Sequence, residues 1–162
     1  SLMATLDAKN RWNVENLKDK TDIVIDITDL KQTVYVYKCV GCVVKVNGKC
    51  TNVTVDGSQK TGVVFETVVS ACEVINSKKV QVQATGTIPN ITIDNSEGVQ
   101  VYLPKDEKNV EIITSKAVEI NVVVPGATDD AEPLEHAIPQ QFVTKFNSAG
   151  KLFTEPVAHV GV

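Results

Sequence analysis

The feature that most constrains this chain is a repeat of short triplets, in which two apolar residues flank one other residue, at intervals of about 19 residues. Two sets of triplets alternate along the chain. Each repeat therefore holds two short strands, separated by turn formers such as Asn47-Gly48 and Asp56-Gly57. The first set is Val34/Val36, Val53/Val55, Cys72/Val74, Ile91/Ile93 and Val110/Ile112, and the second is Ile25/Ile27, Val44/Val46, Gly62/Val64, Val80/Val82, Val99/Val101 and Val118/Ile120.

Each triplet describes a strand with one buried face, because side chains alternate between the two faces of a strand. One coil cannot bury that face alone, so successive coils must stack with their apolar residues in register. Strands stacked in this way are parallel, and their connections are right-handed in almost all known folds. We therefore predict an all-β fold in which residues 22–124 form a right-handed parallel β-helix of about six coils. The 28 valines suit such strands, and the regular step in two sets argues against an antiparallel sandwich.

The middle residue of each triplet is predicted to point outward. One outer row consists of Tyr35, Thr54, Glu73, Thr92 and Glu111, and the other consists of Asp26, Lys45, Val63, Gln81, Gln100 and Glu119. Such rows are typical of a solvated sheet surface or of a flat docking surface for another protein. Periodicity alone does not distinguish these two interpretations.

The regular interval ends near Val124, and the rest of the chain divides into shorter segments. Residues 1–21 form a lead-in segment, residues 125–139 an acidic loop with prolines, and residues 140–162 a C-terminal β-hairpin. The hairpin concentrates large apolar residues, namely Phe142, Val143, Phe146, Leu152 and Phe153. An open β-helix end and exposed apolar groups both need a partner. We therefore predict a homodimer that exchanges its C-terminal strands.

Charge and hydropathy argue against several classes of function. The net charge is −4, with acids and bases mixed along the chain, whereas nucleic-acid partners need a basic face. No apolar run is long enough to span a membrane, and no secretory leader is recognisable. We therefore expect a cytoplasmic protein that neither binds nucleic acid nor inserts into a membrane.

Four cysteines, Cys39, Cys42, Cys50 and Cys72, raise the question of a metal site. The pair Cys39-x-x-Cys42 has a spacing found among zinc ligands, but the sequence lacks the second closely spaced pair of such sites. Cys72 lies in an alternating apolar strand, where it serves as a small apolar residue. We expect free thiols, no metal and no cofactor.

Several segments spread along the chain match a known pattern in the same order. They include Arg11-Trp12-Asn13-Val14-Glu15-Asn16, Gly48-Lys49-Cys50-Thr51-Asn52-Val53-Thr54-Val55-Asp56, Val74-Ile75-Asn76-Ser77, Gly98-Val99-Gln100-Val101-Tyr102-Leu103 and Pro139-Gln140-Gln141-Phe142. Together they resemble the C-terminal domain of the cyclase-associated proteins, and the resemblance covers nearly the whole chain.

The resemblance implies a domain of the actin cytoskeleton that binds actin monomers and prefers the ADP-bound form. It further implies that the domain promotes nucleotide exchange on actin, supports filament turnover, and dimerises by exchanging its C-terminal hairpin. The candidate actin contacts are outward residues of the matched segments and their surroundings: Lys45, Lys49, Asn52, Thr54, Asp56 and Glu73.

Other functions of the same fold fit the sequence less well. Tubulin-folding cofactors stimulate GTP hydrolysis by chemistry that resembles an arginine finger. The only arginine here is Arg11, which precedes the first predicted coil. A polysaccharide-cleaving enzyme could use Glu73 and Glu111, about 9–10 Å apart on one predicted face, but Thr92 lies between them and no other group converges. A tubulin-cofactor-like or scaffold β-helix that binds another protein without catalysis stays open, and we expect no enzyme activity.

Overall fold

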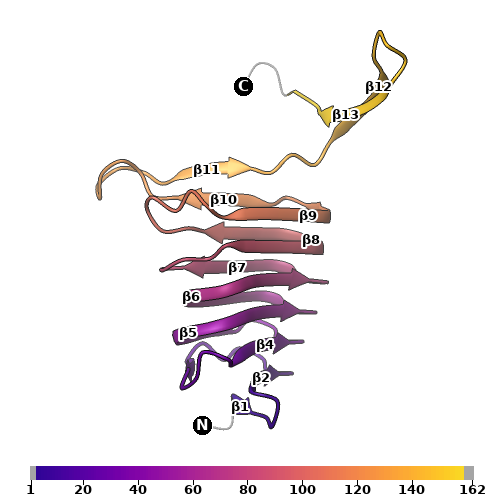
Figure 1. The fold of residues 1–162 in the computed structure, drawn as a ribbon. Helices are drawn as coiled ribbons and strands as arrows, with labels where there is room; N and C mark the ends of the chain where they lie inside the picture. Colours follow the sequence, from indigo (N-terminus) through magenta and orange to yellow (C-terminus); the bar gives the residue numbers. More distant parts are fainter. Residues whose placement is uncertain (1–2, 159–162) are drawn as a thin grey trace.

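The computed structural model describes residues 3–158, which form an elongated stack of β-strands with a hairpin at one end (Figure 1). The strands are β1 (Thr5–Leu6), β2 (Arg11–Glu15), β3 (Ile23–Asp26), β4 (Thr33–Tyr37), β5 (Val43–Asp56), β6 (Gln59–Ile75), β7 (Lys78–Ala84), β8 (Asn90–Tyr102), β9 (Glu111–Val118), β10 (Asn121–Val124), β11 (Leu134–Ala137), β12 (Phe142–Phe146) and β13 (Leu152–Pro156). The predicted all-β class is confirmed, as a parallel β-solenoid of about six turns. Among residues 3–158 no helix is long and apolar enough to cross a membrane.

Each coil contributes strands to two faces of the solenoid, as the long strand β5 shows. Its first half pairs in parallel with β3, and its second half pairs in parallel with β4. Strand β6 repeats this arrangement, because its first half pairs with β7 and its second half with β8. The long strands thus turn a corner between the faces. The inward residues of both faces meet in one core, made largely of valine and isoleucine.

The first set of triplets stacks as predicted over four coils, through the pairs Val34–Val53, Val53–Cys72 and Cys72–Ile91. The prediction for the next coil is wrong, because Ile91 pairs with Ile112 and not with Val110. This step is 21 residues long (112 − 91), two more than the 19 of the preceding step (91 − 72). The loop at residues 104–110 absorbs the extra length. Ile113, and not Glu111, therefore continues the outward row.

The second set of triplets differs from the prediction in three places. Val44 pairs with Ile23 instead of Ile25, Val101 pairs with Val122 instead of Ile120, and Val63 and Phe65 are buried in place of the expected Gly62 and Val64. In the first two differences the pairing is shifted by two residues. Side chains alternate with a period of two, so a shift of two residues leaves the same side of the strand facing the core.

In the third difference, the inward and outward residues of the first half of β6 are exchanged relative to the prediction. Val63 and Phe65 are each 1% exposed, although Val63 was expected to point outward. In the run Gly62-Val63-Val64-Phe65, alternation alone does not show which residues face the core. Burial of the large Phe65 ring is more favourable than burial of Val64, so Phe65 and Val63 face inward. The outer row of this face therefore consists of Val24, Lys45, Val64, Gln83 and Tyr102. Gln81 and Gln100 pair with each other beside this row. The predicted members Asp26, Val63 and Glu119 do not belong to it.

One corner of the solenoid consists of two rows of residues with positive φ, and we call it the left-handed corner. The first row is Asn16, Lys38, Gly57, Asn76, Asn95 and Lys116, and the second is Asp19, Gly41, Lys60, Lys79, Gly98 and Glu119. In each coil two residues separate the rows, the first facing inward and the second exposed. Glycine and asparagine tolerate this conformation better than other residues. This explains their recurrence in the first row.

The spacing of the Cys39-x-x-Cys42 pair follows from this corner. Both residues occupy inward positions that flank the exposed turn, and the next coil has Ser58 and Thr61 at the same two positions. All four cysteines are buried free thiols. Among residues 3–158 no cluster of three or more potential metal ligands occurs.

The two ends of the solenoid are covered differently. At the N-terminal end, β1 pairs antiparallel with β2, and at the other end β11 pairs antiparallel with β10. Strand β9 pairs with β8 alone among the described strands. The β12–β13 hairpin projects away from the stack (Figure 1), and residues 159–162 of the predicted tail lie outside the described residues.

Candidate functional site

Four of the six predicted contact residues lie together on one outer face. Asn52, Thr54 and Asp56 alternate along the second half of β5, and Glu73 of β6 pairs directly with Thr54. Tyr35 pairs with Thr54 on the other side, and Thr92 pairs with Glu73. The surface defined by the row Tyr35, Thr54, Glu73 and Thr92 is called the Thr54 face below.

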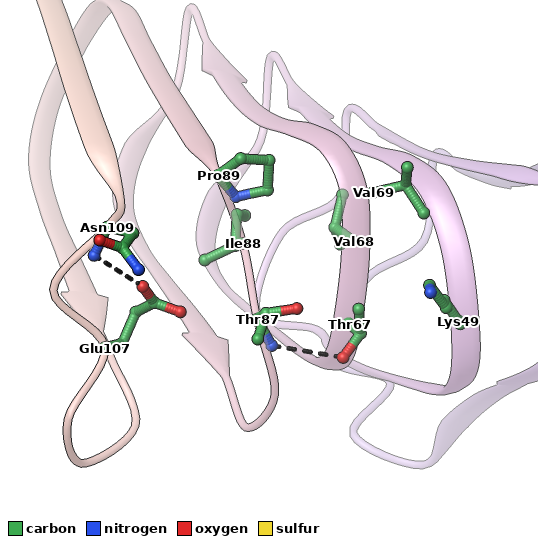
Figure 2. A pocket seen from close by; sticks show the side chains of 9 residues that line it. All are labelled: Lys49, Thr67, Val68, Val69, Thr87, Ile88, Pro89, Glu107 and Asn109. Carbon is green, nitrogen blue, oxygen red and sulfur yellow. Dashed lines mark hydrogen bonds between the residues drawn. The ribbon is translucent and has the colours of Figure 1, made fainter.

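The other two predicted contacts lie elsewhere. Lys45 is on the opposite face, where it pairs with Val24 and Val64. Lys49 follows the bend of β5 and lines a surface hollow of about 370 Å³ at the edge of the Thr54 face (Figure 2). Lys45 therefore cannot contact a partner that docks only on the Thr54 face, whereas Lys49 lies at its margin.

The hollow beside Lys49 has an apolar floor and polar rims. Val68 and Ile88, each 1% exposed, lie beneath it, and Val69 and Pro89 form its walls. Its far rim is formed by Glu107, whose carboxylate accepts a hydrogen bond of 3.0 Å from the backbone N–H of Asn109 (Figure 2). The opposite charges of Lys49 and Glu107 at its two ends suit a partner segment with a small apolar group between polar ones.

An aromatic cluster at one end of the Thr54 face was missed in the sequence. The rings of Tyr35 and Tyr37 stack with centroids 5.6 Å apart. The guanidinium of Arg11 lies 4.6 Å from the Tyr35 ring centroid, and the Lys38 ammonium lies 5.2 Å from that of Tyr37. The signal was present in the alternation Tyr35-Val-Tyr37, which places both rings on one face. Aromatic residues with a neighbouring arginine are frequent centres of binding energy at protein interfaces.

Asp56 ties this cluster to the predicted contacts. The Tyr35 hydroxyl donates a hydrogen bond of 2.8 Å to Asp56 Oδ2. Partial burial, together with this carboxylate, raises the pKa of Tyr35 to about 12. The hydroxyl therefore stays protonated at neutral pH, and the bond holds Tyr35 and Asp56 in fixed positions before any partner binds.

The remaining predicted residues differ in how free they are to make contacts. The side-chain oxygen of Asn52 accepts a hydrogen bond of 3.1 Å from the backbone N–H of Ala71, so it already supports the coil above it. Thr54 and Glu73 are half-buried, and their side chains have no hydrogen bond or ion pair among the described contacts. They are therefore the more available recognition groups of the face.

The two carboxylates considered for hydrolysis, Glu73 and Glu111, do not share a row. Glu73 pairs with Thr92, whereas Glu111 pairs with Asn90 and lies in a different column. The predicted sharing of one row by Glu73 and Glu111 is therefore wrong, because the 104–110 loop shifts the last coil by two residues. The Thr54 face combines polar and aromatic side chains, a composition that suits docking of another protein.

Comparison with known proteins identifies the family. Residues 3–159 match the protein family described as Adenylate cyclase associated (CAP) C terminal. The chain belongs to this family. The resemblance inferred from the sequence is thereby confirmed, and it extends over the solenoid and the hairpin alike.

Members of the CAP C-terminal family from distant organisms are similar to this chain. The Arabidopsis thaliana "Cyclase-associated protein 1" is 46% identical over 156 residues, which cover 96% of this chain and 33% of the relative. The Dictyostelium discoideum "Adenylyl cyclase-associated protein" is 43% identical over 151 residues, covering 93% of this chain and 32% of the relative. The chain thus spans about a third of the length of these relatives.

A solved structure from the family has the same fold. The crystal structure of the cyclase-associated protein from Cryptosporidium parvum superimposes with a TM-score of 0.88 at 31% sequence identity. The match covers 95% of this chain and 94% of that one, so it includes most of the solenoid and of the tail.

Proposed function

We propose that this domain binds actin monomers through the Thr54 face, favours ADP-actin and promotes exchange of the nucleotide bound to actin. The observation that carries the proposal is a face with Tyr35, Thr54 and Glu73 in register, on a member of the CAP C-terminal family. Actin binding is the activity that the family resemblance implies. Asn52, Asp56 and Lys49 are proposed as flanking contacts, and Lys45 is not, because it lies on the opposite face.

The proposed exchange activity needs no catalytic side chain. A protein that binds one conformation of its partner more tightly shifts the partner toward that conformation. If the Thr54 face fits the state of actin with an open nucleotide cleft, binding itself speeds release of ADP. The size of the effect is limited by the difference in affinity for the two states.

We further propose that the domain is a homodimer that exchanges its C-terminal strands. Three of the five predicted dimer residues are strongly exposed: Phe142 at 56%, Phe146 at 69% and Leu152 at 62%. Val143 is 38% exposed and Phe153 is half-buried. The free edge of β9 lies at the C-terminal end of the solenoid, near the hairpin. Pairing of a second copy's hairpin with this edge would cover both the unpaired backbone of β9 and the apolar side chains of the hairpin.

The cellular setting follows from the same proposal. A domain that recycles actin monomers acts in the cytoplasm, within the actin cytoskeleton. The names of several relatives refer to adenylyl cyclase. Those relatives are about three times as long as this chain, so the function proposed for the domain does not include that association.

The decisive experiment compares one substitution on each face. Thr54→Lys places a long charged side chain at the centre of the Thr54 face, and Gln83→Lys does the same on the opposite face. We expect Thr54→Lys to weaken binding of fluorescently labelled ADP-actin at least about tenfold and to slow nucleotide release, as for a central interface residue. Gln83→Lys is expected to change neither.

The results separate the parts of the proposal. Undetectable binding of ADP-actin by the unmodified domain would exclude the function itself. Equal loss in both variants, with the fold intact, would exclude the Thr54 face as the site. Equal affinity for ADP-actin and ATP-actin would exclude the proposed preference.

A further inference from the structure

The left-handed corner carries a cluster of lysines, of which the Thr54 face involves only Lys38, through its contact with Tyr37. Lys38, Lys60, Lys79 and Lys116 occupy positive-φ positions in the two rows, and Lys78 lies between the rows. These five, called the basic corner below, are all exposed. They account for five of the 16 basic residues of a chain whose net charge is −4. The clustering therefore runs against the overall charge.

The backbone conformation makes lysine an unexpected choice at these positions. Side chains with a Cβ atom are disfavoured at positive φ, and glycine and asparagine are favoured there. Lys60 and Lys79 have φ values of 49° and 55°, while the same row has Gly41 one coil before and Gly98 one coil after. The corner thus accepts glycine, and lysine replaces it where the charge cluster is densest. Residues held in strained conformations of this kind are frequent at functional sites.

The arrangement of the charges also opposes stability. Lys60 and Lys79 lie opposite each other on adjacent coils, because Gln59 pairs with Lys78 and Thr61 pairs with Val80. Their backbones are thus about 4.8 Å apart, and like charges in this position repel. The ion pairs within residues 3–158 join Arg11 to Asp7 and Lys145 to Glu155, so none involves a lysine of the basic corner. Glu97 lies opposite Lys78 in the next coil, whereas Lys60 and Lys79 face each other.

Two shallow hollows lie along the corner and share these lysines. One, of about 330 Å³, is lined by Lys60, Lys79 and Gln81 together with the backbone at Gly41 and Gly62. The other, of about 310 Å³, is lined by Lys78 and Lys116 with Asn76 and Asn95, and also by the carboxylate residue Glu97, which pairs in register with Lys78. Amide side chains therefore accompany the ammonium groups in both hollows. Together they can donate hydrogen bonds to carboxylates as well as attract them.

The shape and chemistry of the basic corner favour an extended acidic peptide over other anions. From Lys38 to Lys116 the corner spans four coil steps, or about 19 Å, which matches about six residues of extended peptide. The cations are lysines, and the bidentate geometry with which arginine recognises phosphate is lacking. Neither hollow is lined by an aromatic side chain of the kind that anchors a protein in a membrane interface.

We propose that the basic corner is a docking surface for an extended acidic segment of a partner protein, with a carboxylate bound between Lys60 and Lys79. The site borders the Thr54 face only at Lys38, which contacts the Tyr37 ring, and the proposed carboxylate site at Lys60 and Lys79 does not use the row Tyr35, Thr54, Glu73 and Thr92. It is charge-driven, so its affinity falls as ionic strength rises.

The test uses the whole chain and a fluorescein-labelled polyglutamate peptide of about six residues, with fluorescence anisotropy at low salt. The double variant Lys60→Asn/Lys79→Asn removes two charges but relieves the strained backbone conformation. We expect it to bind the peptide about tenfold more weakly and to unfold at an equal or higher temperature. Lys60→Arg/Lys79→Arg keeps the charge and should bind within about twofold of the original chain.

A matched control removes two lysines at the opposite corner. Lys105→Asn/Lys108→Asn lowers the net charge by the same amount and should leave peptide binding unchanged. Equal weakening in the control, or unchanged binding by the Lys60→Asn/Lys79→Asn variant, would overturn the site. Binding to vesicles with about 30% phosphatidylserine but not to the peptide would overturn the peptide assignment in favour of a membrane surface.

Discussion

The backbone N–H of Ser58 donates a hydrogen bond to the side-chain oxygen of Ser77, one coil further along, at 3.1 Å. The same contact recurs between Cys39 and Ser58 at 3.1 Å and between Ser77 and Ser96 at 3.2 Å. Each serine hydroxyl in turn donates to a carbonyl two residues earlier in its own coil. The left-handed corner is therefore held together by a buried row of serines whose hydroxyl groups each accept one hydrogen bond and donate another.

The row predicts a large effect for a small substitution. Ser77→Ala leaves the buried N–H of Ser58 without a partner, and we expect a loss of about 1–3 kcal/mol in the free energy of unfolding. Ser70→Ala, at an exposed position of β6, should change it by less than about 0.5 kcal/mol. Urea unfolding of both variants provides the comparison. Equal stability of the two would mean that water or a backbone shift replaces the Ser77 oxygen.

The Tyr35–Asp56 hydrogen bond predicts a pH dependence at high pH. The folded pKa of Tyr35, about 12, lies above the value of about 10 for an unfolded tyrosine. Its stabilisation is therefore complete below about pH 10 and is lost as the pH rises through about 12. Spectroscopic titration should show one tyrosine ionising near pH 12, and Tyr35→Phe should abolish that step. A normal titration of all tyrosines would contradict the observed geometry.

The reversed strand at Val63 can be tested with neighbouring substitutions. Val63→Asp places an unpaired carboxylate in the core, where it costs several kcal/mol and is expected to unfold the domain. Val64→Asp points outward and should reduce stability by about 1 kcal/mol or less. Circular dichroism during heating distinguishes the two. The opposite order of stability would restore the assignment based on alternation alone.

The buried cysteines predict slow thiol chemistry. Burial raises the pKa of Cys50 to about 11 and that of Cys72 to about 12, so neither forms the reactive thiolate at neutral pH. We expect little reaction with a disulfide reagent in the native protein and four equivalents after denaturation. Elemental analysis should find no stoichiometric zinc. A fast native reaction, or unfolding on addition of a chelator, would contradict this prediction.

Removal of the hairpin tests the proposed dimer. Deleting residues 140–162 takes away the exposed Phe142, Phe146 and Leu152 and the strands proposed to cover the second copy. We expect light scattering to show a dimer for the intact chain at micromolar concentration and an aggregation-prone monomer for the deletion. Affinity for immobilised actin should also fall, because the shortened domain is no longer bivalent. An unchanged dimer after the deletion would place the interface elsewhere.

The sequence by itself determined the repeat, the parallel stacking and the row Tyr35, Thr54, Glu73 and Thr92. These follow from local alternation combined with a constant coil length, and both can be read along one chain. The turn at Asp56-Gly57 was equally readable, because glycine marks positive φ. The row, and with it most of the Thr54 face, was therefore predicted correctly.

Only the tertiary structure decided the register of coils whose corners differ in length. The loop at 104–110 replaced Glu111 by Ile113 in the outer row, and the size of Phe65 turned Val63 inward. Alternation states which residues share a side of a strand, but not how many residues a corner absorbs or which side faces the core. The same stacking separated Lys45 from the Thr54 face and brought Lys60 beside Lys79, since both relationships arise between coils.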